Sequence, residues 1–309
     1  MKRWLGLLLL VVLSTTIALA AAEVSGRLVG LGQPALYEMA LGYGYRLKPD
    51  QTAIRLRDAT VTVNHAGLRA TREWDLTAHR RILFIGDSIT YGGSYVDDKQ
   101  IFSELACPPN AICGNAGVNA YGIENMSRRI EVETQHLKPT TIVVTLFYGD
   151  ALRGTAALSA MPVFSKPPFK PLAAITEAAA FVLDGARDAM RFAKWDTTEI
   201  PFNDASRTEA VRAMNGLFLA LAGSGADVLL VYTPTRNEVL HGRKAIGALV
   251  FDLMAKSGQP VLDMLQFLHP DDLGRIYYDE VHLEVAGHRL YGDIIGKHLI
   301  GQRQSSRHP

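Results

Sequence analysis

The chain has 309 residues, of which 48% are hydrophobic and 20% are charged, which is the composition of a globular protein and not of a disordered one. Its 32 Lys and Arg residues almost balance its 31 Asp and Glu residues, so the sequence offers no basic surface for a nucleic-acid partner. The length suits one large domain with an extension.

The first 22 residues form a segment of their own. Lys2 and Arg3 precede an apolar run over residues 4–13, and small residues follow at 18–20. This order is typical of a secretory signal with an A-x-A cleavage site. The uncharged stretch 4–22 is 19 residues long, enough to span a bilayer, so a retained membrane anchor is the alternative. Both interpretations predict an extracytoplasmic protein, either periplasmic or secreted.

Residues 23–79 are predicted to be a small N-terminal extension of β and irregular structure. Polar and apolar residues alternate over 59–63, as in a half-buried strand. Turn signals stand at Pro49-Asp50 and at Ala66-Gly67. We expect this extension to pack on the main domain.

From residue 80 onward, apolar strand patterns alternate with amphipathic helix patterns. The strands are expected near 82–85, 141–147, 227–232 and 260–264, and the helices near 124–136, 207–222, 243–256 and 285–300. Such alternation predicts βαβ units and a parallel sheet covered on both faces. The main domain is therefore assigned to residues 80–302, and residues 303–309 to a tail.

Residues 151–206 interrupt this alternation. Four prolines at 162, 167, 168 and 171 exclude a regular helix there, and an Ala-rich helix pattern then runs from Leu172 to about Trp195. An insertion of this length after a sheet strand is a candidate lid or substrate wall. Surface decoration is the alternative.

The two cysteines, Cys107 and Cys113, lie six positions apart. In an exported protein such a pair predicts a disulfide that closes a small loop. A metal site is the weaker alternative, because no histidine or further cysteine stands nearby at ligand spacing.

The chemistry of the chain begins where the apolar run over residues 82–85 stops at Gly86-Asp87-Ser88. Ligands of parallel sheets bind beyond the carboxyl ends of the strands, and Ser88 is placed there. Much later, Asp279 and His282 bring an acid and an imidazole three positions apart. Together these residues supply a nucleophile, a base and an orienting acid, the parts needed for acyl transfer.

Three motifs resemble those of a known family. Gly86-Asp87-Ser88-Ile89-Thr90, Asn115-Ala116-Gly117 and Asp279-x-x-His282 look like blocks I, II and V of the SGNH/GDSL hydrolases, in the family's order. Residues 63–69 are similar to a segment of exported members associated with cell-surface polysaccharide systems. The resemblance implies a three-layer α/β/α flavodoxin-like hydrolase domain behind the small N-terminal extension.

The resemblance also implies the roles of individual residues. Ser88 would be the nucleophile, His282 the general base, and Asp279 the group that orients the imidazole. The backbone N–H groups of Ser88 and Gly117 would donate to the oxyanion. Asp279 as a simple helix cap and Ser88 as a turn serine are the alternative roles.

One block departs from the family pattern. Block III usually reads Gly-x-Asn-Asp, whereas the matching stretch here is Phe147-Tyr148-Gly149-Asp150, so Gly149 stands where the oxyanion-binding Asn is expected. Loss of one such donor costs about 10²–10³ in rate when nothing replaces it. The candidate oxyanion and substrate-binding residues are therefore Asp87, Asn115, Gly117, Asn119 and Gly149.

The function expected from these residues is that of an exported serine esterase. It would hydrolyse small esters, with O-acetyl groups on a glycan as one candidate substrate, and would need no cofactor. Two alternatives remain open. One is a periplasmic polysaccharide O-acyltransferase that uses the same residues, and the other is a glycan-binding or assembly protein with little catalytic activity.

Overall fold

The computed structural model describes residues 2–154, 164–192 and 203–305. Its centre is a parallel sheet of five strands, which are β5 (Arg81–Ile85), β6 (Ile112–Asn115), β7 (Thr141–Leu146), β8 (Asp227–Tyr232) and β9 (Val261–Asp263). Their spatial order is β6-β5-β7-β8-β9, and all neighbours are parallel. This 2-1-3-4-5 order is that of a flavodoxin-like doubly wound sheet, so the predicted fold class is confirmed.

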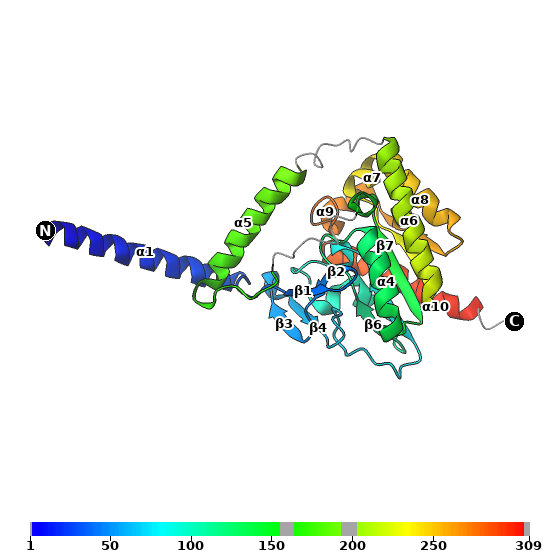
Figure 1. Cartoon of the computed structure of the whole chain (residues 1–309), viewed down its shortest axis with the longest axis horizontal. Helices are drawn as coiled ribbons and strands as arrows, with labels where there is room; N and C mark the ends of the chain where they lie inside the picture. The colour runs from blue at the N-terminus through cyan, green and yellow to red at the C-terminus, as the bar shows by residue number, and fades with distance from the viewer. Residues whose placement is uncertain (1, 155–163, 193–202, 306–309) are drawn as a thin grey trace.

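Helices cover both faces of the sheet. Leu83 and Ile85 point to one face, where they pack in a cluster with residues of α4 (Ile123–Leu137), α6 (Asp204–Ser224) and α8 (Ala245–Lys256). Ile82 and Phe84 point to the other face and pack with α3 (Phe102–Leu105) and α10 (Val285–Ser305). The apolar runs seen in the sequence exist because both sides of each strand are buried. Figure 1 shows the sheet held between these helices.

The remaining short elements lie in the connections. The short α-helices are α2 (Ser88–Tyr91), α7 (Arg236–His241) and α9 (Leu273–Ile276). The 3-10 turns are η1 (Leu56–Asp58), η2 (Asp98–Gln100), η3 (Tyr148–Leu152), η5 (Lys170–Leu172), η6 (Met264–Phe267) and η7 (Pro270–Asp272). Several of these elements stand at the carboxyl ends of the strands and carry the candidate site.

The region before the sheet contains two antiparallel hairpins. One is formed by β1 (Tyr37–Ala40) and β2 (Gly44–Leu47), the other by β3 (Gln51–Ile54) and β4 (Thr60–Val63). Apolar side chains of the hairpins belong to the same buried cluster as the sheet residue Leu83. The extension therefore packs on the main domain and shares its core.

The chain begins with a long apolar helix, α1 (Lys2–Leu28). Its part from Arg3 to Leu28 is long and apolar enough to cross a membrane, and none of its most apolar window is buried against the protein. A secretory signal and a membrane anchor both have this character. Figure 1 shows α1 projecting from the body of the molecule, with its C-terminal end beside α5 (Ala173–Phe192).

The insertion and the cysteine pair can be compared with their predictions. The Ala-rich helix predicted for 172–195 is α5, whereas Pro162 and the segment 193–202 lie outside the described residues. Cys107 and Cys113 form a disulfide, with their Cα atoms 5.9 Å apart, so the predicted pairing is confirmed. The tail after residue 305 also lies outside the described part of the chain.

Candidate active site

Ser88 stands at the carboxyl end of β5, at the start of the one-turn helix α2. The carboxylate of Asp87 caps this helix by accepting the N–H of Ile89 at 2.8 Å. Gly86 is needed in the turn because a Cβ there would lie 2.0 Å from Thr90 Oγ1. The Gly-Asp-Ser sequence therefore places Ser88 at the edge of the sheet where ligands of such folds bind.

Ser88, His282 and Asp279 meet at this edge although Ser88 and His282 are 194 positions apart. Ser88 Oγ lies 2.8 Å from His282 Nε2, and His282 Nδ1 lies 2.7 Å from Asp279 Oδ2. An Nδ1–H that donates to Asp279 leaves Nε2 free to accept the Ser88 hydroxyl proton. The arrangement is that of a nucleophile, a base and an orienting acid.

Opposing effects set the pKa values of the acid and the base. Burial alone would raise the pKa of Asp279, but the hydrogen bonds from His282 and Val281 and the charge of the imidazolium hold it at about 2. Burial alone would lower the pKa of His282, but the hydrogen bond to Asp279 and the charges of Asp279 and Asp87 raise it above 6.5. Asp279 is therefore ionised at neutral pH and favours the protonated form of the His282 imidazole.

The loop that carries the acid and the base is fixed by its own backbone. Asp279 Oδ1 accepts the N–H groups of Val281 at 2.9 Å and of His282 at 2.8 Å, and Tyr278 N–H donates to the His282 carbonyl at 2.9 Å. The buried Tyr277 hydroxyl donates to the Pro234 carbonyl at 2.6 Å, which ties the loop to the end of β8. The imidazole is held in place before any substrate binds.

The loop with Asn115 and Gly117 serves mainly to hold α2. Gly117 N–H donates to Asn115 Oδ1 at 2.8 Å, so this proposed oxyanion donor is occupied within the chain. Asn115 Nδ2 donates to Thr90 O at 2.6 Å and to Ser103 Oγ at 2.9 Å, which uses both of its N–H groups. Both N–H groups of Asn115 are thus used within the chain, and Asn115 does not supply the donor that Gly149 lacks. The amide of Ser88 remains the candidate oxyanion donor for which no hydrogen bond is found among the described residues.

The other two candidates differ in their surroundings. Asn119 is exposed, and its carbonyl accepts the hydroxyl of Tyr45 at 2.6 Å. Gly149 is buried, and a Cβ at this position would lie only 2.3 Å from Cε2 of the Phe147 ring. The ring of Phe147 thus fills the space into which a side chain at position 149 would extend.

Arg153 lies beside Asp87, although the sequence pattern did not single it out. Its Nη1 contacts Asp87 Oδ2 at 3.3 Å and Asp150 Oδ1 at 3.1 Å, and it also donates to the Tyr121 carbonyl. Burial first and the charge of Asp87 second raise the pKa of the Asp150 carboxyl well above its usual value. Arg153 belongs to the start of the 151–206 insertion, so at least that part of the insertion lies against the site. The lid role of the whole insertion stays a prediction.

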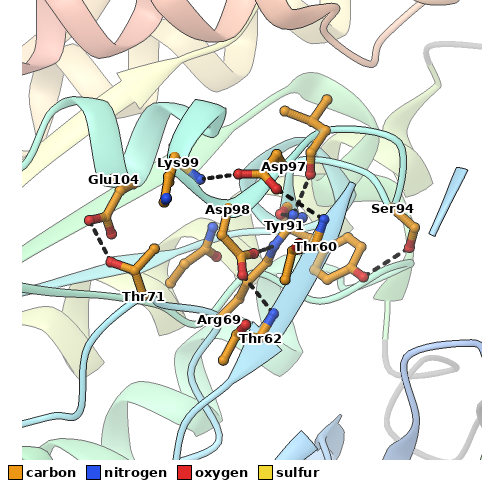
Figure 2. A network of polar contacts seen from close by, with 12 residues as sticks. Thr60, Thr62, Arg69, Thr71, Tyr91, Ser94, Asp97, Asp98, Lys99 and Glu104 are labelled. Atoms are coloured by element: carbon orange, nitrogen blue, oxygen red, sulfur yellow. Dashed lines mark hydrogen bonds and ion pairs between the residues drawn. The ribbon is translucent and has the colours of Figure 1, made fainter. Parts of the chain in front are cut away.

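Arg69, in the segment 63–69 noted above, connects the extension to the loop that follows α2 (Figure 2). Its buried guanidinium donates to the carbonyls of Tyr91 and Gly93, each at 2.8 Å, and of Val96 at 2.5 Å. It also pairs with Asp98 at 2.8 Å. Because each N–H group of a buried guanidinium needs a partner, this network fixes the loop behind the nucleophile.

No protein-family model matches the sequence, and no match is found among the curated proteins. Several solved structures are similar in three dimensions. An alpha/beta hydrolase enzyme, LAE5, from the metagenome of Lake Arreo is 15% identical, with 71% of this chain and 96% of that chain covered and a TM-score of 0.43. An acetylxylan esterase from Geobacillus stearothermophilus is 18% identical, with 70% and 92% covered and a TM-score of 0.41. A lipase/acylhydrolase from Enterococcus faecalis is 17% identical, with 72% and 96% covered and a TM-score of 0.41.

Proposed function

We propose that the protein is an exported ester hydrolase of the SGNH/GDSL type that cleaves small esters through an acyl-Ser88 intermediate. The observation that carries this proposal is the chain of contacts from Ser88 Oγ to His282 at 2.8 Å and from His282 to Asp279 at 2.7 Å. Its position at the carboxyl edge of a flavodoxin-like sheet supports the same conclusion, since ligands of such sheets bind there. The order of the three sequence motifs is consistent with it.

The reaction uses these groups in two steps. His282 takes the proton of Ser88 while Oγ attacks the ester carbonyl carbon, and the carbonyl electrons move to the oxygen, which the Ser88 N–H stabilises. When the tetrahedral intermediate collapses, the alcohol leaves with the proton from His282. Water then attacks the acyl-enzyme with His282 again as the base, which releases the carboxylic acid and restores Ser88.

The exposure of the site favours hydrolysis over acyl transfer. The side chains of His282 and Asp279 are 30% and 45% exposed. Water therefore reaches His282, the base that activates it for hydrolysis. An O-acyltransferase would have to exclude water from the same acyl-enzyme while a sugar hydroxyl attacks. We propose O-acetyl groups on a glycan as the substrate class of the hydrolase.

Acetate release distinguishes the candidate functions. The purified protein and its Ser88→Ala variant would be incubated with esters of increasing acyl length and with acetylated oligosaccharides, and the free acid would be measured. The proposal expects Ser88-dependent acid release that is fastest for acetyl esters. Acetylated acceptor sugar formed without an equal amount of free acetate would show transfer instead. Release by the Ser88→Ala variant at the wild-type rate would contradict the proposal.

We also propose that the domain lies outside the cytoplasm and stays attached to a membrane through α1. Glu23, which is buried, accepts the backbone N–H groups of Ala174 at 3.0 Å and of Ile175 at 3.1 Å, so it caps the N-terminus of α5. Gly26 packs so closely on α5 that a Cβ there would lie 2.7 Å from the Ala174 Cβ. The end of α1 is thus built into the fold.

Cleavage near residue 22 would disturb this junction. Only residues 23–28 of α1 would remain, which is too short a segment to be helical by itself. It would also place a new charged amino group at Glu23, beside the positive end of α5. The disulfide between Cys107 and Cys113 supports an oxidising compartment for the rest of the chain.

Intact mass and membrane extraction test this localisation. The chain would be expressed with a C-terminal tag, and the membrane fraction would be washed with alkaline carbonate. We expect the protein in the washed membranes, with a mass that includes residues 2–22. A variant with Ala18→Leu and Ala20→Leu, which removes the A-x-A site, should behave identically. A soluble wild-type protein that begins at residues 21–23 would overturn the retained anchor.

A further inference from the structure

Four side chains next to the candidate site form what we call the rim cluster, namely Arg57, Tyr95, Tyr278 and Glu284. The rings of Tyr95 and Tyr278 are stacked, with their centroids 4.3 Å apart and an angle of 24° between their planes. The guanidinium carbon of Arg57 lies 5.6 Å from the centroid of each ring. Arg57 also donates two hydrogen bonds to the carboxylate of Glu284, at 2.9 and 3.2 Å.

The rim cluster is continuous with the loop that carries the acid and the base. Tyr278 immediately precedes Asp279, and its N–H donates to the carbonyl of His282. The hydroxyl of Tyr95 donates to the carbonyl of Leu283 at 3.0 Å. Burial first and the charge of Asp279 second raise the pKa of Tyr95. The rim cluster therefore adjoins the loop that carries Asp279 and His282.

The N-terminal extension delivers Arg57 to this position from the tight turn of the β3–β4 hairpin. Arg57 has φ 60° and ψ 29°, and Asp58 has φ 57°, both in the left-handed region. The N–H of Ala59 donates to the carbonyl of Leu56 at 3.2 Å, so Arg57 and Asp58 are the two central residues of this turn. Positive φ at both central residues is what a type I′ hairpin turn requires. The hairpin geometry thus accounts for this conformation and leaves Arg57 exposed at the tip of the turn.

The exposed surface of the cluster has a definite chemical character. Tyr95 covers one face of Tyr278, yet Tyr278 remains 50% exposed and so presents apolar ring surface to solvent. The side chains of Arg57 and Glu284 are 54% and 25% exposed. As an ion pair they offer hydrogen-bond donors and acceptors together, with no net charge. A flat apolar surface beside neutral but strongly polar groups matches a sugar ring, which has C–H faces and hydroxyl edges.

We infer that the rim cluster is a subsite for one neutral sugar ring of a glycan ester, with the ring on Tyr278 and its hydroxyls on Arg57 and Glu284. This inference rests on the proposed ester hydrolase function and adds to it the residues that would bind the sugar part of the substrate. A carboxylate-bearing sugar fits less well because Glu284 already neutralises Arg57 and would repel a second carboxylate. The extension would thereby contribute to substrate choice as well as to stability.

Two acetyl esters that differ only in the sugar part test the inference. Acetylated xylotriose carries the sugar, whereas ethyl acetate is small and has no ring, and acetate release gives kcat/KM for each. The quantity compared is the ratio of kcat/KM for the oligosaccharide to kcat/KM for ethyl acetate. We expect Tyr278→Ala to lower this ratio by about five- to tenfold, which is the effect of losing one ring contact. Arg57→Ala should lower the same ratio, whereas Tyr278→Phe, which keeps the ring, should restore it.

Leu219→Ala, an exposed substitution on α6, serves as a control that should leave the ratio unchanged. An unchanged ratio in both Tyr278→Ala and Arg57→Ala would overturn the inference, as would a wild-type protein that cleaves ethyl acetate but not the acetylated sugar. Both results leave the proposed Ser88 ester hydrolase in place, although the second would remove acetylated glycans as its substrate class. A wild type that releases no more acetate than Ser88→Ala from either ester would instead remove the proposed function, and the inference with it.

Discussion

Position 149 is where the chain departs from the motifs of the family that it resembles, and its surroundings predict what happens when an Asn is placed there. A Cβ at Gly149 would lie 2.3 Å from Cε2 and 2.4 Å from Cζ of Phe147, closer than real Cβ contacts come. The Phe147 ring is only 7% exposed and lies under the guanidinium of Arg153 at 5.4 Å. It cannot turn away without losing this packing. Gly149→Asn is therefore expected to destabilise the protein and not to repair the oxyanion site.

The size of the effect follows from the packing. Inserting atoms into a filled site costs about 1–3 kcal/mol, which lowers Tm by about 2–4 °C for each kcal/mol in a domain of this size. Phe147→Ala alone should cost about 3–5 kcal/mol, because it empties a buried ring site. In the double variant the Asn can occupy the space that the ring leaves. The stability loss of the double variant should therefore be about 1–3 kcal/mol smaller than the sum of the two single-variant losses.

Denaturant unfolding of the wild type, both single variants and the double variant measures this coupling. Gly216→Ala in α6 is the matched control, since nothing lies within 4 Å of a Cβ there and alanine favours a helix by about 1 kcal/mol. A Gly149→Asn protein as stable as the wild type, or strictly additive losses in the double variant, would show that the Phe147 ring does not occupy the space beside position 149.

Three further predictions concern the site and the disulfide. Wild-type kcat/KM should fall as the pH drops through the pKa of His282, which lies above 6.5. The reason is that only the neutral imidazole accepts the Ser88 proton. A flat profile from about pH 5 to 8 would indicate another base. Asp279→Asn should lower kcat by about 10⁴ and move the midpoint of the remaining pH profile downward, since the charge that raises the pKa of His282 is lost. Replacing Cys107 and Cys113 by Ser should lower the free energy of unfolding by about 2–3 kcal/mol, because the unfolded chain regains the entropy that the short disulfide loop removes. Equal denaturation midpoints of the variant and the wild type would contradict this.

The parallel sheet and the meeting of Ser88 with His282 could be predicted because both depend on regular features. Apolar runs of strand length mark buried strands, and the carboxyl ends of parallel strands share one edge. Gly86 and Asp87 mark the tight turn and the helix cap that present Ser88, and both are local signals. The signals for the strands, the turn and the cap are each encoded within a few residues, whereas the pairing of Ser88 with His282, 194 positions later, is indicated by the order of the three motifs.

The surroundings of the site could not be predicted in the same way. Phe147 and Arg153 stand in an irregular turn, and their side-chain directions depend on contacts with segments far away in the sequence. Gly117 was expected to donate to an oxyanion, but its N–H is used by Asn115 two residues earlier, a competition that no periodicity reveals. Arg57 joins the rim cluster from a hairpin turn with a left-handed backbone, which the residue type does not suggest.

In the mechanism proposed above, His282 activates the hydroxyl of Ser88 as a nucleophile. Reaction with a fluorophosphonate, followed by mass spectrometry of the digested protein, reports this activation at the residue itself. We predict one adduct per chain, on the peptide that contains Ser88, with no adduct in Ser88→Ala and much slower labelling in His282→Ala. A wild type that stays unlabelled where a known serine esterase reacts, or a Ser88→Ala variant labelled as fast as the wild type, would contradict the account.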